Sequence, residues 1–297
     1  MLIRMKELKE VIALPPTPLN DDGKIDKESL RSVIDFELEN RCHGVGVLAA
    51  AGEGYLLSDE DWKTVVKTSV DHMNGRGPLM VGCASMSTGR AVELIRAADD
   101  FGADAILAFN PQGMRTYSEN ELYHHFKALT DATDIHIVAY ARADDPISFD
   151  VLKRLVNEER ISHIKNGYLD CAFLQKLDKS LGDKLYKFCG VDHWTLRFLL
   201  LGCQGIMTAT ASVLPEENVK LLSLVKEGKI DEARKLWYEK FLTWNDSGFF
   251  ENWQWAHKYA LKLMGVIKSD KVLPPQSLGA EYHKKEIESL LKHQRII

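Results

Sequence analysis

The chain has 297 residues, of which 45% are hydrophobic and 27% are charged, so it is long enough to bury one large core. Its net charge of -5, with acidic and basic residues interspersed, argues against a basic surface that binds nucleic acid. The five cysteines are scattered and have no CxxC spacing, which argues against a disulfide framework and against a zinc site.

The N-terminal segment MLIRMKELKEVIA has no long apolar stretch followed by a small-residue cleavage site. No apolar run approaches the roughly 20 residues that a membrane helix needs. We therefore expect a cytoplasmic protein that does not span a membrane.

Short apolar runs rich in Val, Ile and Ala alternate with amphipathic helical segments over the first 220 residues or so. The expected strands are Val11 to Leu14, Gly44 to Leu48, Leu79 to Cys83, Ala105 to Phe109, Ile135 to Tyr140, Ile161 to Lys165, Leu185 to Cys189 and Gly205 to Thr208. The expected helices between them include Lys27 to Glu39, Asp59 to Met73, Ser87 to Phe101, Ser118 to Thr130, Phe149 to Asn157 and Ala172 to Leu181. Parallel strands need crossover helices, so this alternation predicts an α/β fold, a (β/α)8 TIM barrel, with an open doubly wound sheet as the alternative.

Beyond about Pro215 the pattern becomes helical. The expected segments are Glu216 to Lys226, Ile230 to Asn245, Trp253 to Met264 and Glu281 to His293, with a loop over Lys271 to Ser277. We therefore predict a barrel domain over residues 1–225 that carries the active site and a C-terminal helical extension over 226–297. The extension holds an aromatic cluster, for which helix packing and a subunit contact are both possible roles: Trp237, Trp244, Phe249, Phe250, Trp253 and Trp255.

In a barrel of this kind, functional groups stand at the carboxyl ends of the strands. The fifth expected strand ends at Tyr140 and the sixth at Lys165, so these two side chains lie on adjacent strands. Burial of a lysine favours the neutral amine, which attacks carbonyl carbons, and a neighbouring phenol can transfer the proton. The alternative for Lys165 is a solvated lysine at a strand end.

Other strand ends supply candidate binding groups. The small residues Ala50 and Ala51 let backbone N–H groups approach a substrate carboxylate, although the same segment also suits an ordinary turn. Arg115 and Arg142 are candidate carboxylate clamps or exposed loop residues. The adjacent residues His124 and His125 point about 100° apart on a helix, so we expect no metal site there.

The order of these segments resembles the dihydrodipicolinate synthase and N-acetylneuraminate lyase family of class I Schiff-base lyases. The resemblance is carried by Pro15 to Leu19, Ala51-Gly52-Glu53, Tyr140, Ile164 to Gly167, Gly190 to Asp192 and Gly205 to Thr208. It implies that Lys165 forms the imine, that Tyr140 is the proton shuttle and that the backbone at Ala50 and Ala51 binds a 2-oxo acid carboxylate. Gly190 and Met207, at the ends of the seventh and eighth strands, are further candidate substrate-binding residues. The resemblance also implies a homo-oligomer, a dimer or tetramer, and no cofactor.

The chain departs from the synthase pattern of this family at three places. Ala50 and Ala51 replace the two threonines of the relay, Gln112 to Met114 replace a tyrosine pair, and Asp144 or Asp145 falls near the usual arginine position. We therefore expect aldol cleavage or dehydration of a 2-keto-3-deoxy sugar-acid-like substrate, as in 5-dehydro-4-deoxyglucarate dehydratase. The alternatives are 4-hydroxy-tetrahydrodipicolinate synthase, which condenses pyruvate with aspartate semialdehyde, and a non-catalytic barrel that binds a 2-oxo acid.

Overall fold

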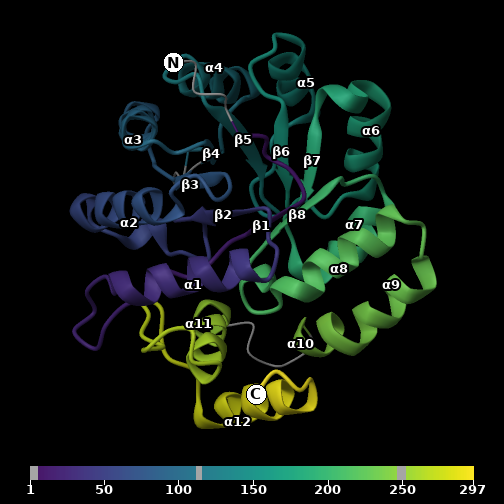
Figure 1. Cartoon of the computed structure of the whole chain (residues 1–297). Coiled ribbons are helices and arrows are strands. Elements are labelled where there is room, and N and C mark those ends of the chain that lie inside the picture. The colour runs from purple at the N-terminus through teal and green to yellow at the C-terminus, as the bar shows by residue number, and fades with distance from the viewer. Residues whose placement is uncertain (1–5, 112–115, 246–251) are drawn as a thin grey trace.

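The computed structural model describes residues 6–111, 116–245 and 252–297. Eight parallel strands form a closed barrel in sequence order, β1 to β8, and β1 pairs with β8 to close it (Figure 1). This is the expected TIM barrel. The strands are β1 Val11–Ala13, β2 Gly44–Val47, β3 Leu79–Cys83, β4 Ala105–Ala108, β5 His136–Ala141, β6 His163–Asn166, β7 Tyr186–Cys189 and β8 Gly205–Thr208.

Helices surround the barrel and begin where the sequence supplies capping side chains. Four of these helices are capped by a serine side chain that accepts a hydrogen bond from a backbone N–H of the first turn, and each helix begins at the residue after its serine. The capping residues are Ser58, Ser87, Ser118 and Ser148. The helices after β1 to β8 are α1 Lys27–Glu39, α2 Asp59–Met73, α3 Thr88–Phe101, α4 Glu119–Thr130, α5 Phe149–Asn157, α6 Cys171–Leu181, α7 Thr195–Leu200 and α8 Pro215–Lys226. The sequence did not predict α7, because a helix of six residues is too short to show a clear 3.6-residue hydrophobic period.

Alternation along the strands separates two packing layers. Ala139, Ala141 and Ile164 belong to the layer between barrel and helices, whereas Val138 and Phe188 belong to the cluster inside the barrel. Successive side chains in a strand point to opposite faces, so Tyr140 and Lys165 share the inward direction.

The C-terminal extension continues from α8 with α9 Ile230–Leu236, a π-helical segment over Trp237–Leu242, α10 Thr243–Asn245, α11 Trp253–Leu263 and α12 Glu281–His293. Figure 1 shows α11 next to α1 at one side of the barrel and α12 beyond α11, at the bottom of the view. The helix expected over Ile230 to Asn245 is thus present, with a π-helical segment over Trp237–Leu242 between its two α-helical parts. No helix in the described ranges is both long enough and apolar enough to cross a membrane.

A buried ion pair ties the extension to the barrel. Lys258 on α11 pairs with Glu53, which follows β2, and both side chains are 0% exposed. Lys258 Nζ also donates to the carbonyl of Lys271 (2.7 Å), and the other Glu53 oxygen accepts from the N–H of Leu273 (2.8 Å). Because a buried charge is stable only when paired and hydrogen-bonded, these contacts hold α11 and the β2 loop in one arrangement.

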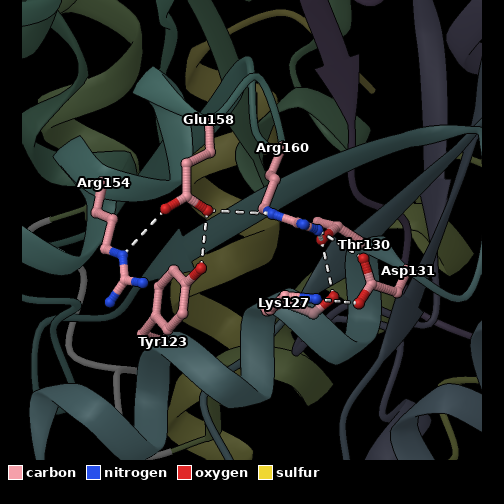
Figure 2. Close-up of polar contacts among 7 residues, drawn as sticks. All are labelled: Tyr123, Lys127, Thr130, Asp131, Arg154, Glu158 and Arg160. Carbon is pink, nitrogen blue, oxygen red and sulfur yellow. Dashed lines mark hydrogen bonds and ion pairs between the residues drawn. The ribbon is translucent and has the colours of Figure 1, made fainter.

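On the outer surface, a polar cluster joins α4 to the end of α5, and Figure 2 shows it centred on Glu158. The Glu158 carboxylate accepts from Tyr123 Oη (2.8 Å), from Arg154 Nε (3.0 Å) and from Arg160 Nε (3.2 Å). Arg160 also donates to Asp131 (2.6 Å), which is the C-cap of α4. The residues of this cluster belong to the helical layer, and none of them lines the cavity described below.

Candidate active site

A cavity of about 280 Å³ lies at the carboxyl ends of the strands. This is the end of a barrel where side chains from several strands meet. The residues that line it come from both sides of the boundary expected at 225/226. They are Leu14, Ala49, Ala50, Ala51, Leu107, Tyr140, Lys165, Gly190, Val191, Asp192, His193, Thr208, Ala209 and Thr210 from the barrel, and Trp244, Asn245, Trp253 and His257 from the extension.

Lys165 is only 4% exposed and extends from β6 into this cavity. Its Nζ donates to the carbonyl of Gly190 (3.0 Å) at the end of β7. No carboxylate is paired with Lys165 among the ion pairs between described residues. The amine therefore has a carbonyl partner that holds it at the end of β6, inside the cavity where a substrate carbonyl carbon can reach it.

Tyr140 is the cross-strand partner of Lys165, and the Lys165 Nζ lies 3.7 Å from the centre of the Tyr140 ring. The ring also makes an edge contact with Phe109, with centroids 5.4 Å apart. The phenol therefore stands at the same mouth of the barrel as the amine, as the sequence predicts.

The loop after β2 is tightly folded around Ala50 and Ala51. Leu48 (φ 60°) and Glu53 (φ 55°) both adopt the left-handed conformation. A Cβ on Gly52 would lie 2.8 Å from the backbone nitrogen of Leu48, so the turn requires glycine at this position. Thr17 Oγ1 donates to the Gly52 carbonyl (2.5 Å), which anchors the loop to the segment after β1. Ala50 and Ala51 line the cavity on this loop, and their side chains carry no hydroxyl.

The other predicted site residues are placed differently. Gly190 lines the cavity, whereas Met207 is fully buried inside the barrel and its neighbour Thr208 is the lining residue. Arg142 is not among the lining residues, and it binds the Asp144 carboxylate through Nε (3.0 Å) and Nη2 (2.6 Å). Arg115 lies outside the described residues, as do Gln112 and Met114.

Several polar lining residues were not predicted as site residues from the sequence. One is Asp192, whose Oδ1 accepts from the backbone N–H (2.8 Å) and the hydroxyl (2.5 Å) of Thr210. Its position directly after the seventh strand end was the available signal. Another is His257 on α11, for which no local sequence signal exists, because only the docking of the extension places it beside the barrel mouth.

Two residues of the aromatic cluster have a role that the sequence did not predict, because they line the cavity. Trp244 and Trp253 line the cavity, while Trp237 stacks on Phe241 and Trp255 stacks on Tyr259. Phe249 and Phe250 lie outside the described residues. Within the described ranges, no three His, Cys, Asp or Glu side chains are grouped so as to hold a metal ion.

Comparison with known proteins agrees with this architecture. The model of the dihydrodipicolinate synthetase family matches residues 7–294. The chain is 32% identical to the 4-hydroxy-tetrahydrodipicolinate synthase of Pelobacter propionicus over 89% of this chain and 91% of that protein. It is also 32% identical to the enzyme of that name from Methanopyrus kandleri, over 96% of each chain.

Solved structures give the same result. The chloride-inhibited dihydrodipicolinate synthase from Acinetobacter baumannii, complexed with pyruvate, superposes with a TM-score of 0.88 at 25% identity and covers 99% of this chain and 100% of that one. Together with the barrel, the buried lysine and the adjacent tyrosine, these matches show that the chain belongs to the dihydrodipicolinate synthetase family of class I Schiff-base lyases.

Proposed function

We propose that Lys165 forms an imine with a 2-oxo acid in the cavity. The observation that carries this proposal is the position of Lys165, which is almost fully buried, faces the cavity and lies against the ring of Tyr140. The amine attacks the keto carbon, and loss of water from the resulting adduct gives the imine. The imine then accepts the electron pair that is released when a neighbouring bond breaks.

In this proposal, the β2 loop binds the carboxylate of the 2-oxo acid. Backbone N–H groups at Ala50 and Ala51 serve as donors, because the small side chains leave the backbone accessible to an anion. The tight turn around Gly52 and its anchor at Thr17 support this role by holding the loop in place.

For the second half of the reaction, we favour a 2-keto-3-deoxy sugar-acid-like substrate. In aldol cleavage, the C4 hydroxyl loses its proton to the Tyr140 phenolate, the C3–C4 bond breaks, and its electron pair forms an enamine with the imine. In dehydration, the Tyr140 phenolate takes a proton from C3 to give the enamine, and the resulting phenol then gives this proton to the C4 hydroxyl, which leaves as water. Support comes from Ala50 and Ala51, which remove the side-chain hydroxyls expected of a synthase relay.

Condensation of pyruvate with aspartate semialdehyde is the second candidate. The specific observation in its favour is the similarity of the chain, at 32% and 30% identity, to two proteins named 4-hydroxy-tetrahydrodipicolinate synthase. Coupled turnover of the two substrates by the wild-type protein would support this candidate over the first.

The test is a substrate screen on the wild type beside Lys165→Ala. Borohydride reduction in the presence of pyruvate should attach the pyruvate carbon skeleton to Lys165 in the wild type and leave Lys165→Ala unmodified. Turnover of 2-keto-3-deoxy sugar acids that depends on Lys165 is the expected result. An unmodified lysine would contradict the proposal, and trapping without turnover of any 2-oxo acid would instead indicate a binding protein.

The family resemblance also supports a homo-oligomer, a dimer or tetramer. We propose that this chain assembles in the same way. Light scattering coupled to size-exclusion chromatography tests this, and a monomer at micromolar concentration would contradict it.

A further inference from the structure

One wall of the cavity comes from the C-terminal extension, and two of its residues each have a side-chain polar atom with no hydrogen-bond partner among the residues that the structure describes. His257 is 5% exposed, and its Nε2 has no hydrogen-bond partner among the described residues. Asn245 is also 5% exposed, and its Nδ2 is likewise unpartnered in the described part of the chain. Both residues line the cavity. Buried polar atoms in folded proteins are nearly always hydrogen-bonded, so two such atoms on one cavity wall require an explanation.

The hydrogen-bonding role of His257 follows from its other ring nitrogen. Nδ1 lies 2.7 Å from the carbonyl oxygen of Trp253, and a carbonyl can only accept, so Nδ1 carries the hydrogen. Burial lowers the pKa of His257, which keeps the ring neutral. The opposite nitrogen, Nε2, is therefore a lone-pair acceptor.

The two unpartnered atoms have complementary chemistry. Nε2 of His257 accepts a hydrogen bond, and the amide nitrogen of Asn245 donates one. A hydroxyl group both donates and accepts hydrogen bonds, so its chemistry matches both the acceptor and the donor on this wall. A carboxylate only accepts and an ammonium only donates, so neither matches both atoms.

The position of His257 is fixed by its neighbours in the chain and around its ring. The next residue, Lys258, makes the buried ion pair with Glu53 and donates to the carbonyl of Lys271. The rings of Trp244 and Trp253 meet the His257 ring edge to face, with centroids 5.6 and 5.9 Å away. A side chain held on several sides selects a ligand by geometry, because it loses little freedom when the ligand binds.

We infer that His257 and Asn245 form a hydroxyl-binding subsite, which receives the part of the substrate beyond the imine carbon. The ligand class is a hydroxylated aldehyde or hydroxy acid. This inference rests on the proposed function, since it assigns the second substrate of the same site. His257 acts here as a specificity-determining residue, and the chemical step remains with Lys165 and Tyr140.

The experiment compares two acceptors that differ in hydroxyl groups, glyceraldehyde and propionaldehyde, in condensation with pyruvate. The variants are His257→Leu, which removes the acceptor, and His257→Gln, which returns an amide oxygen. His283→Leu is a matched control, because His283 on α12 is also 5% exposed with both nitrogens unpartnered among described residues, yet does not line the cavity.

We expect the wild type to prefer glyceraldehyde in kcat/KM. His257→Leu should reduce that preference about tenfold, the effect of losing one hydrogen bond, while His257→Gln retains part of it. His283→Leu should match the wild type, and borohydride trapping of pyruvate should be equal in all four proteins. An unchanged preference in His257→Leu, or an equal loss in His283→Leu, overturns the inference.

A binding measurement keeps the test independent of turnover and of imine formation. The imidazole nitrogen NMR signal of Nε2, assigned by its loss in His257→Leu, should shift with glycerate and stay in place with propionate. Failure of the wild type to trap pyruvate would contradict the proposed function alone. Absence of a glycerate-specific shift would contradict the subsite, whatever the trapping shows.

Discussion

The Nζ of Lys165 lies 3.0 Å from the carbonyl oxygen of Gly190, and a Cβ built on Gly190 would lie 3.1 Å from that same nitrogen and 2.7 Å from Lys165 Cγ. The glycine therefore does two things for the lysine. Its carbonyl holds the amine, and its missing side chain leaves the space in which the lysine lies. Such contacts are closer than side-chain carbons normally tolerate, so any larger residue at position 190 displaces the amine.

Gly190→Ala should slow imine formation by roughly 10- to 100-fold, because displacement of a reacting group by about 1 Å has an effect of that size. The measurement is the rate of borohydride-trapped adduct with pyruvate. Gly89→Ala is the control, since a Cβ at Gly89 would meet no atom within 4 Å. Equal trapping rates in Gly190→Ala and the wild type would show that the lysine needs no such space.

Tyr140→Phe should keep imine formation and lose turnover. The substitution preserves the ring that packs on Phe109 and under Lys165, and it removes only the hydroxyl that transfers the proton. Loss of a general acid–base group lowers kcat by about 100-fold or more. Pyruvate trapping and steady-state turnover on one preparation separate the two steps. Full turnover in Tyr140→Phe would assign proton transfer to another group.

Lys258→Met should destabilise the protein by about 3–5 kcal/mol, because it leaves the Glu53 carboxylate buried without its partner. Urea unfolding monitored by tryptophan fluorescence gives the free energy of unfolding. Lys268→Met is the matched control, since its pair with Glu28 is 67% and 74% exposed and should contribute less than about 1 kcal/mol. Combining Lys258→Met with Glu53→Gln should recover part of the loss. Equal effects of the two single substitutions would contradict the role of burial.

Stability should fall in mild acid because of histidines at the amino-terminal end of the barrel. Burial, with a smaller contribution from the neighbouring His136, whose ring centroid is 4.9 Å away, lowers the pKa of His163 to about 4. The unfolded chain therefore binds more protons than the folded one between roughly pH 6.5 and pH 4. His163 therefore contributes up to roughly 3 kcal/mol to the free energy of unfolding at the upper end of this window, and this contribution is lost as the pH falls through it.

Urea unfolding of the wild type and of His163→Phe at several pH values tests this. The variant should lose less stability between pH 6.5 and pH 4 than the wild type, because a phenylalanine does not titrate. Parallel curves for the two proteins would assign the acid sensitivity to other groups, such as His125 and His257, whose pKa values are also lowered by burial.

Much of the fold was predictable because its signals are local. Strand and helix periods alternate along the chain, and capping serines mark the helix starts, so predicted and observed elements agree within a residue or two for most of the barrel. The adjacency of Tyr140 and Lys165 was predictable for the same reason. In a parallel barrel with sequential strand order, the ends of consecutive strands are neighbours.

The sequence by itself thus determined the barrel, the direction of Lys165 and the neighbour that it meets. Only the tertiary structure decided that Asn245 and His257 reach the cavity and that Glu53 pairs with Lys258. It also decided that Thr208 lines the cavity and that its neighbour Met207 does not. The pair Glu53 and Lys258 shows the physical reason. These residues are about 200 positions apart, and no local period relates them, so their contact exists only after the barrel has closed and the extension has packed against it.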